Sequence, residues 1–212
     1  MTITLQLLSN HFILHPSGAI YWKEKATLLI ADVHLGKVAH FRKYGSAVPL
    51  NLSNENFERL NNVIDFFNPQ QICFLGDLFH SSINKDWLFF EDWVSKHYNK
   101  RIYLIAGNHD IISPLKYEEL QIKIVSEWVT NQFLFTHYPD ERKNLFNFSG
   151  HIHPAVWLQG TGKQKLKLAC FFKTKNQIIL PAFGVFTGKF VLEPKITDQI
   201  FVVTKEEVIE IS

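Results

Sequence analysis

The sequence predicts an α/β fold with α+β character, in which a two-sheet core is flanked by helices. In the first half of the 212-residue chain, short apolar runs alternate with helical patterns. This alternation is typical of crossover units on a largely parallel sheet. The second half is nearly all strand-like. Two packed sheets with helices outside are the simplest arrangement that uses both halves.

The predicted strands are short runs of β-branched and aromatic residues, bounded by Gly, Pro, Asn or Ser. These runs are Leu5–Leu8, Phe12–His15, Thr27–Ala31, Gln71–Leu75, Arg101–Ala106, Ile122–Val125, Gln132–Thr136, Lys165–Phe172, Gln177–Leu180 and Asp198–Thr204.

Two helices are expected between the early strands. The first runs from Asn54 to Phe67, with Ser53 or Asn54 as its N-cap, and the second runs from Asn84 to Tyr98. In both segments large apolar residues recur at intervals of three and four, which is the spacing of one buried helix face.

Composition indicates a soluble protein with one domain over residues 1–212. Hydrophobic residues make up 46% and charged residues 20%, and the net charge of +2 is too small to argue for nucleic acid by itself. Two cysteines give no disulfide framework, so a reducing cytoplasm is the expected location. We expect no membrane association, because no run approaches the ~20 apolar residues of a bilayer span and the start lacks signal-peptide features.

Five short polar segments each stand where a strand-like run ends. They are Ala31-Asp32-Val33-His34, Gly76-Asp77-Leu78-Phe79-His80, Gly107-Asn108-His109-Asp110, Thr136-His137 and Gly150-His151-Ile152-His153. In open α/β sheets, ligands bind beyond the carboxyl ends of the strands. We therefore expect these five loops to converge on one point.

The polar side chains in these segments are of the types that bind metal ions. Carboxylates and imidazoles suit Mn, Fe or Zn better than Ca or Mg alone, and the absence of Cys argues against a closed structural zinc site. Asp32 and His34 lie two positions apart, as do His151 and His153. In extended backbone both members of each pair would face one way. Two ions ~3.5–4 Å apart would clamp the attacking and leaving oxygens and lower the pKa of a bound water.

Each fragment alone is a weak signal. A lone histidine at a strand end is more often a satisfied core or surface residue, and Gly76, Gly107 and Gly150 could merely be turn glycines. The occurrence of all five fragments, in this order and at strand ends, favours a metal centre over coincidence.

This ordered set resembles the calcineurin-like metallophosphoesterases, and the resemblance implies a metallophosphoesterase sandwich fold. Further segments resemble the bacterial DNA ligase-associated phosphoesterases, which are described as DNA-damage-response endonucleases. These segments are Ala31-Asp32-Val33-His34-Leu35-Gly36-Lys37, Phe41-Arg42, Val48-Pro49, Gly150-His151-Ile152-His153-Pro154, Leu180-Pro181-Ala182-Phe183-Gly184 and Phe186-Thr187-Gly188.

The resemblance implies a role for each motif residue. One ion would be held by Asp32, His34 and His153, and the other by Asn108, His137 and His151. Asp77 would bridge both ions. His109 would be the catalytic histidine, a role that suits an imidazole because an unperturbed histidine pKa of ~6.5 allows both protonation states near neutrality.

His80 departs from the phosphoprotein phosphatases of this superfamily, which usually have Asp three residues after the bridging Asp. The segment Gly76-Asp77-Leu78-Phe79-His80 instead resembles the double-strand-break-repair nucleases, which favours phosphodiesters over phosphoproteins and a catalytic part for His80. The alternative is that His80 only bonds nearby backbone.

Weaker signals flank the motifs. Arg42 is a candidate for substrate binding through bidentate phosphate contacts, and Phe41 and Tyr44 beside it could stack a base; the alternative for Arg42 and Lys43 is a solvated cation beside a core Phe. Lysines also alternate along one predicted strand, at Lys163, Lys165 and Lys167, with Lys173 and Lys175 as an extension. This lysine stripe fits the solvent-exposed face of a sheet better than a phosphate-binding strand.

The leading functional hypothesis is a metal-dependent phosphodiesterase or nuclease acting on DNA in repair, by attack of a metal-bridging hydroxide. The cofactor is expected to be two divalent ions, Mn first and Fe or Zn as alternatives. Resemblance adds an association with a DNA ligase, helicase or exonuclease. The alternative is a small-molecule phosphatase, cyclic-nucleotide phosphodiesterase or nucleotide pyrophosphatase. A binding subunit with a vestigial centre is disfavoured, because no expected ligand is missing.

Overall fold

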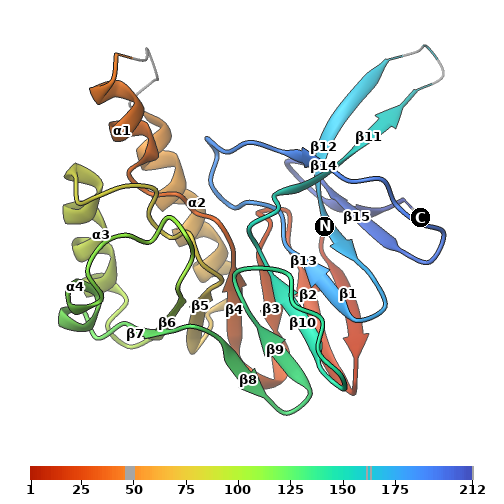
Figure 1. The fold of residues 1–212 in the computed structure, drawn as a ribbon, viewed down its shortest axis with the longest axis horizontal. Helices are drawn as coiled ribbons and strands as arrows, with labels where there is room; N and C mark the ends of the chain where they lie inside the picture. Colours follow the sequence, from red (N-terminus) through yellow and green to blue (C-terminus); the bar gives the residue numbers. More distant parts are fainter. Residues whose placement is uncertain (46–50, 161, 163, 212) are drawn as a thin grey trace.

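The computed structural model describes residues 1–45, 51–160, 162 and 164–211. Within this part of the chain, helices, a first β-sheet and a second β-sheet form successive layers (Figure 1). The predicted two-sheet sandwich with flanking helices is therefore confirmed. Val48-Pro49 and Lys163 lie outside the described residues, as do the side chains of Lys43 and Ser53.

The first sheet has seven described strands in chain order, β1-β2-β3-β4-β5-β6-β7. The strands β1 to β4 pair antiparallel, whereas β4 to β7 pair parallel. Their bounds are Ile3–Leu7, Asn10–Leu14, Ile20–Trp22, Thr27–Ile30, Gln71–Phe74, Arg101–Ile105 and Lys123–Val125. The predicted parallel crossover units thus occupy one half of this sheet.

The second sheet follows the order β14-β11-β12-β13-β10-β9-β8, with β15 on β12 and β16 on β15. At its centre β10 pairs parallel with both β9 and β13. The bounds from β8 to β16 are Trp128–Thr130, Phe133–Phe135, Phe146–Ser149, Pro154–Gln159, Lys165–Lys173, Gln177–Ile179, Phe190–Val191, Gln199–Val203 and Val208–Glu210.

The described helices are α1 (Lys37–Lys43), α2 (Asn51–Phe67), α3 (Lys85–Lys96) and α4 (Pro114–Glu119), with a 3₁₀ turn at Lys23–Lys25. The predicted cap of α2 was wrong, because the helix begins at Asn51 and Ser53 and Asn54 lie within it. The start of α3 was confirmed, since the Asn84 side chain accepts a hydrogen bond from the Asp86 N–H (3.0 Å). No helix in the described ranges has the length and apolar character to cross a membrane.

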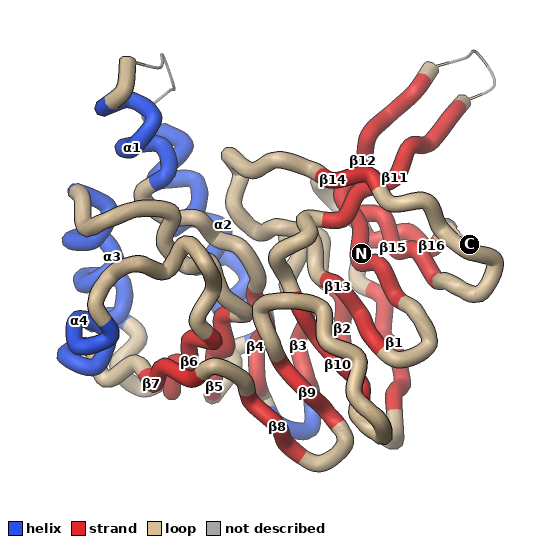
Figure 2. The backbone as a smooth tube through the Cα atoms, in the orientation of Figure 1, coloured by secondary structure: helices blue, strands red, loops and turns tan. Residues whose placement is uncertain are grey.

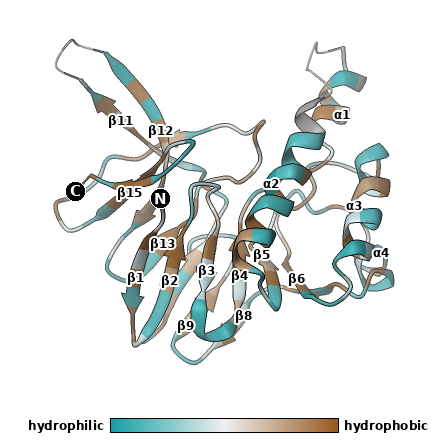
Figure 3. Ribbon diagram, turned by 180° about the vertical axis from the view of Figure 1, so that it is seen from behind, coloured by the Kyte–Doolittle hydropathy of each residue, from teal (hydrophilic) through white to brown (hydrophobic). Residues whose placement is uncertain are grey.

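The core has two layers because alternate residues of each parallel strand face opposite sides. Leu28 and Ile30 of β4 pack under the helices, where α2 and α3 contribute Leu60 and Trp93, among others. Leu29 packs against the aromatic residues of the second sheet. Figure 3 shows the hydrophilic outer side of α2 lying over hydrophobic strands of the first sheet.

Candidate metal centre

Five loops bring the predicted ligands to one end of the two sheets. Three loops follow the adjacent parallel strands β4, β5 and β6, and two follow β9 and β10, which are also adjacent and parallel. The loops lie together above these strand ends (Figure 2). The expected convergence of the five segments is confirmed by this arrangement.

The backbone turns sharply at both members of each pair of ligand candidates that lie two positions apart. Asp32, His34, His151 and His153 have φ angles of 55°, 53°, 66° and 54°, in the left-handed region. The prediction that extended backbone turns each pair to one side was therefore wrong. Asp32 and His34 do share one cluster, but His151 and His153 belong to different clusters.

The first cluster contains Asp32, His34 and His153, whose ligand atoms lie within 4.8 Å of one another. The Nε2 atoms of His34 and His153 are 3.3 Å apart, and His153 Nε2 lies 3.4 Å from Asp32 Oδ1. The backbone N–H of His151 holds the other oxygen of Asp32 at 2.9 Å. Burial lowers the pKa of His34 to about 2, with smaller effects from Lys37 and the neighbouring histidines, so the ring stays neutral near pH 7.

The second cluster contains Asp77, His137 and His151 within the same 4.8 Å limit. His137 Nε2 lies 3.1 Å from His151 Nδ1 and 3.1 Å from Asn108 Oδ1. Burial, followed by the nearby His137, lowers the pKa of His151. The second cluster thus gathers one carboxylate, two imidazoles and one carboxamide.

Asp77 stands between the two clusters. Its Oδ1 lies 3.5 Å from His137 Nε2, and its Oδ2 lies 3.9 Å from His34 Nε2. The side chain is only 3% exposed. One carboxylate therefore presents a different oxygen to each cluster, which is the geometry that a shared ligand requires.

The donor atoms are arranged as a cation would require. His137 Nδ1 faces the Leu75 carbonyl at 3.0 Å, so this nitrogen carries the proton and Nε2 has a lone pair. That lone pair faces Asn108 Oδ1, which is also an acceptor. Asp32 Oδ1 is buried without a hydrogen-bond partner among the described residues. Opposed lone pairs and an unpaired buried carboxylate oxygen cost free energy unless a metal ion lies between them. The residues therefore fit a pair of divalent ions.

Three glycines are required by close approach rather than by turn geometry alone. A Cβ on Gly107 would lie 2.3 Å from Asp77 Oδ1, and one on Gly150 would lie 2.4 Å from Asp32 Oδ2. A Cβ on Gly76 would lie 2.2 Å from His137 Nδ1, and Gly76 also has a φ of +85°. The interpretation of these residues as simple turn glycines is therefore insufficient.

His109 and His80 lie beside the clusters. Their ring centroids are 4.5 Å apart, and that of His109 is 5.6 Å from His34. The backbone N–H of His109 donates to Asp77 Oδ1 (2.9 Å), which ties this loop to the carboxylate between the clusters. Burial lowers the pKa of His80 to about 4, and its Nδ1 is buried without a partner among the described residues. The alternative reading of His80 as a backbone-bonding side chain therefore has no support from its described contacts.

Three residues near the clusters had no role in the sequence-based prediction. Asp110 accepts hydrogen bonds from Phe79 N–H (3.0 Å) and Gly107 N–H (2.9 Å), and burial raises its pKa to about 6. It therefore braces two ligand loops against each other. Lys37 is a half-buried cation whose pKa is lowered by burial and raised by Asp77 and Asp32. Its place directly after the first motif was the only sequence signal for it.

The third such residue, Asn56 of α2, braces the first ligand loop. Its Oδ1 accepts from Val185 N–H (3.0 Å) and its Nδ2 donates to the Val33 carbonyl (3.5 Å). In the same region, the Phe183 and Gly184 N–H groups donate to the Ala31 and Asp32 carbonyls at 2.9 and 3.1 Å. The segment from Leu180 to Gly188, which had no mechanism from sequence, thus supports the backbone of Asp32.

The remaining predicted binding residues lie on or next to α1. Arg42 is exposed, and its role in substrate binding stays a prediction. Phe41 is 36% exposed, and its ring packs edge-on against Phe186 at 5.7 Å and parallel to His80 at 6.3 Å. Tyr44 is 72% exposed and packs against His40. These rings give the surface next to His80 an aromatic character.

The lysine stripe does not form one free cationic face. Lys167 Nζ donates to the Lys189 carbonyl (2.5 Å), and Lys173 Nζ donates to Gln199 Oε1 (2.7 Å). Lys165 is exposed on β12. The prediction that favoured a sheet surface over a phosphate-binding strand agrees with these contacts.

The chain is similar to solved structures and to the model of one protein family. The crystal structure of the Pseudomonas putida nuclease MPE is similar over 100% of both chains, with a TM-score of 0.83 and 28% identity. Yfce, a phosphoesterase from E. coli, aligns over 87% of this chain and 97% of its own, with a TM-score of 0.46 and 14% identity. No curated protein matches the chain. The family model for calcineurin-like phosphoesterases matches residues 26–180, a span that contains both clusters. The chain therefore belongs to the calcineurin-like phosphoesterase family and is a phosphoester hydrolase.

Proposed function

We propose that this chain is a metal-dependent phosphodiesterase or nuclease, with DNA as its substrate and DNA repair as its setting. The observation that carries the proposal is the likeness to a nuclease over the whole length of both chains. The His80–His109 pair beside the two clusters is a second support, since this position departs from the phosphoprotein phosphatases.

The proposed ligands follow the two clusters. Asp32, His34 and His153 hold one ion and Asn108, His137 and His151 hold the other, while Asp77 contacts both. Manganese is the proposed ion, with iron and zinc as alternatives that the same donor set accepts. When bound, two divalent ions supply an activated water and positive charge for the phosphate oxygens.

Residues of the chain position the substrate and the catalytic histidine and supply the proton for the leaving oxygen. His109, fixed through its backbone bond to Asp77, donates a proton to the leaving oxygen. His80 packs against the His109 ring and positions it, while Arg42 binds a phosphate of the substrate. An association with a DNA ligase, helicase or exonuclease belongs to the same proposal and rests on sequence resemblance alone.

The test is a set of rates measured on purified protein with Mn²⁺, using an aryl phosphomonoester, an aryl phosphodiester and single-stranded DNA. We expect the diester and the DNA to be hydrolysed in preference to the monoester. Asp77→Ala should abolish hydrolysis, because it removes the carboxylate that serves both clusters. His109→Ala should lower the rate by about 10²- to 10⁴-fold, the usual contribution of a positioned general acid.

His11→Ala is the matched control, because this exposed histidine pairs with Glu24 outside the site. Its rates should equal those of the wild type. A strong monoester preference without DNA cleavage would favour the small-molecule phosphatase. Wild-type activity in either the Asp77 or the His109 variant would reject the assigned roles.

A further inference from the structure

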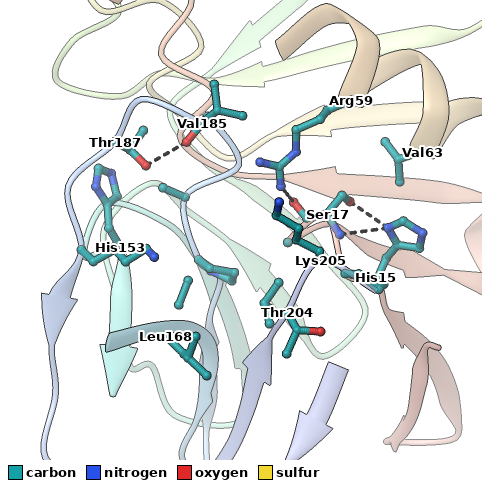
Figure 4. A pocket seen from close by; sticks show the side chains of 18 of the residues that line it. His15, Ser17, Arg59, Val63, His153, Leu168, Val185, Thr187, Thr204 and Lys205 are labelled. Carbon is teal, nitrogen blue, oxygen red and sulfur yellow. Dashed lines mark hydrogen bonds between the residues drawn. The ribbon is translucent and has the colours of Figure 1, made fainter. Parts of the chain in front are cut away.

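A cleft of about 740 Å³ opens beside the metal centre and has no part in the chemistry described so far. His153, a member of the first cluster, lines one end of it. From there the cleft extends between α2, the turn after β2 and the turn after β15 (Figure 4). It therefore leads away from the reacting centre along the protein surface.

The lining of the cleft is cationic. The residues that line it include three that are basic, Arg59, Lys189 and Lys205, and one that is acidic, Glu55. Figure 4 shows Arg59 and Lys205 extending into the cleft toward one another. The lining histidine His15 adds no charge near neutrality, because burial, the amino terminus and Arg59 lower its pKa to about 4.

The Arg59 guanidinium is fixed in orientation and keeps N–H donors for an anion. Its guanidinium lies 4.9 Å from the centroid of the Phe183 ring, and one Nη2 donates to the Ser17 carbonyl at 2.8 Å. Within the described ranges it makes no salt bridge and no other side-chain hydrogen bond. A guanidinium has five N–H donors, so several remain for a ligand. The stacking on Phe183 and the hydrogen bond to Ser17 fix the orientation of the guanidinium before binding. This reduces the conformational entropy that the Arg59 side chain loses when it binds a phosphate.

The same segment of chain connects Arg59 to the metal centre. Phe183, which lies under the guanidinium, donates its backbone N–H to the Ala31 carbonyl, and Gly184 donates to Asp32. Because Arg59 and His153 line the same cleft, a strand whose phosphates follow it would reach the first cluster at His153. Arg59 belongs to neither cluster, so turnover of a small aryl diester bound at the clusters is not expected to depend on it.

We propose that this cleft binds the phosphodiester backbone of a single-stranded polynucleotide on one side of the scissile bond. Arg59 is its fixed phosphate-binding residue, and Lys205 and Lys189 add cationic contacts. This inference rests on the proposed nuclease function and deepens it, because it predicts a substrate longer than the reacting phosphate. A cationic groove that follows the backbone is the usual way in which proteins hold single strands.

The test combines binding and turnover in the Mn²⁺-loaded protein. Binding of a fluorescent single-stranded oligonucleotide is measured by anisotropy in a His109→Ala background, which slows cleavage. Arg59→Gln should raise the Kd by about tenfold or more, as expected for a charge-assisted hydrogen bond. Lys205→Gln should raise it less. The logarithm of the association constant falls as the logarithm of the salt concentration rises, and each lost phosphate contact should make this slope less steep by about 0.7.

The matched control is Lys25→Gln, which removes one positive charge from an exposed position. Lys25 precedes the start of β4, whereas Asp32 follows the end of the same strand, so the two residues lie at opposite ends of β4. It should bind the oligonucleotide as tightly as the parent. In the background with His109 intact, all three variants should hydrolyse an aryl diester at the parent rate. Because Lys205 is exposed, its variant tests the cleft even if Arg59→Gln unfolds.

The outcomes separate this inference from the proposed function. If the wild type cleaves DNA while Arg59→Gln and Lys205→Gln bind like the control, the cleft inference is overturned and the nuclease stands. If DNA is not cleaved but the two variants still lose binding, the nuclease proposal falls and the anion-binding cleft stands. If Arg59→Gln slows the aryl diester as much as the DNA, Arg59 acts through Phe183 on the metal loop, and the cleft inference is overturned.

Discussion

Asp77 turns its two carboxylate oxygens toward different histidines, His137 at 3.5 Å and His34 at 3.9 Å. This division depends on the backbone around it. The residue itself has a φ of +50°, and the N–H of His109 holds its Oδ1. The position of a single side chain is therefore set by the backbone of its own loop and by an N–H of the loop after β6. Changes that leave Asp77 in place but shift its surroundings should disturb the centre as well.

Gly107→Ala tests this dependence. The added Cβ would lie 2.3 Å from Asp77 Oδ1 and 2.4 Å from the Asp77 backbone nitrogen, so the backbone must move. Overpacking of this kind costs about 1–3 kcal/mol, and displacement of a catalytic group by about 1 Å can cost 10²-fold in rate. We expect a loss of at least tenfold in aryl diester turnover, together with weaker Mn²⁺ binding by titration.

Gly188→Ala is the control for that substitution. It adds the same methyl group where no atom lies within 4 Å, so turnover and Mn²⁺ affinity should stay at the wild-type values. Equal behaviour of the two alanine variants would show that the close approach at Gly107 has no effect on Asp77.

At the residue scale, the sequence was informative for the side chains of the five motifs, although it gave no role to Asp110 or Lys37. The segments that hold the carboxylates, histidines and Asn108 were found from residue type and order, and the family resemblance assigned these side chains as ligands. The structure brings the proposed metal ligands together. Asn56 was missed because its side chain meets Val185, which lies 129 positions away along the chain. A buried amide of this kind has no local signature.

At the scale of elements, the strongly periodic helices and most strands of the first sheet were predicted, whereas β10, β11 and four shorter strands (β3, β8, β14 and β16) were missed. The central strand β10 has the sequence FNFS, in which a polar Asn147 interrupts the apolar residues. The structure buries Asn147 and satisfies its amide with the Leu134 carbonyl and Thr136 Oγ1 at 3.2 and 2.8 Å. These partners lie on the neighbouring strand and the residue after it, so the sequence pattern alone could not identify β10.

The helix α2 and the segment after β13 act together on the first ligand loop through Asn56. Asn56→Ala leaves the Val185 N–H and the Val33 carbonyl without that partner, at a cost of about 1–3 kcal/mol for each group left buried and unpaired. We expect lower stability in urea and a decrease in kcat on the aryl diester, because the backbone of Asp32 loses a brace.

Asn54→Ala is the matched variant, since Asn54 is exposed on the same helix two positions earlier. Its midpoint in urea and its kcat should not fall. A normal kcat in Asn56→Ala, despite lower stability, would mean that α2 supports the fold without positioning the ligand loop.

At the scale of the whole molecule, each candidate metal cluster gathers side chains from both sheets. The first sheet supplies Asp32 and His34 and the second supplies His153, while Asp77 of the first sheet faces His137 and His151 of the second. The sheets are joined by the buried layer of aromatic residues between them. A metal ion bound in either cluster would therefore hold the two sheets together, and its binding free energy would add to the stability of the packed state.

Removal of metal should accordingly lower the melting temperature of the whole chain. An ion at 100 times its Kd stabilises the folded state by about 2.7 kcal/mol. For a chain of this length each kcal/mol corresponds to about 2–4 °C, so saturating Mn²⁺ should raise the Tm by roughly 5 to 10 °C per site over chelated protein. His137→Ala should lose much of this rise, because it removes a ligand that the second sheet contributes, whereas His11→Ala should retain it. Equal Tm values with Mn²⁺ and with chelator would show that no ion couples the two sheets. Calorimetry would also separate a local effect from this coupling, since a metal that joins the sheets keeps their unfolding in one transition.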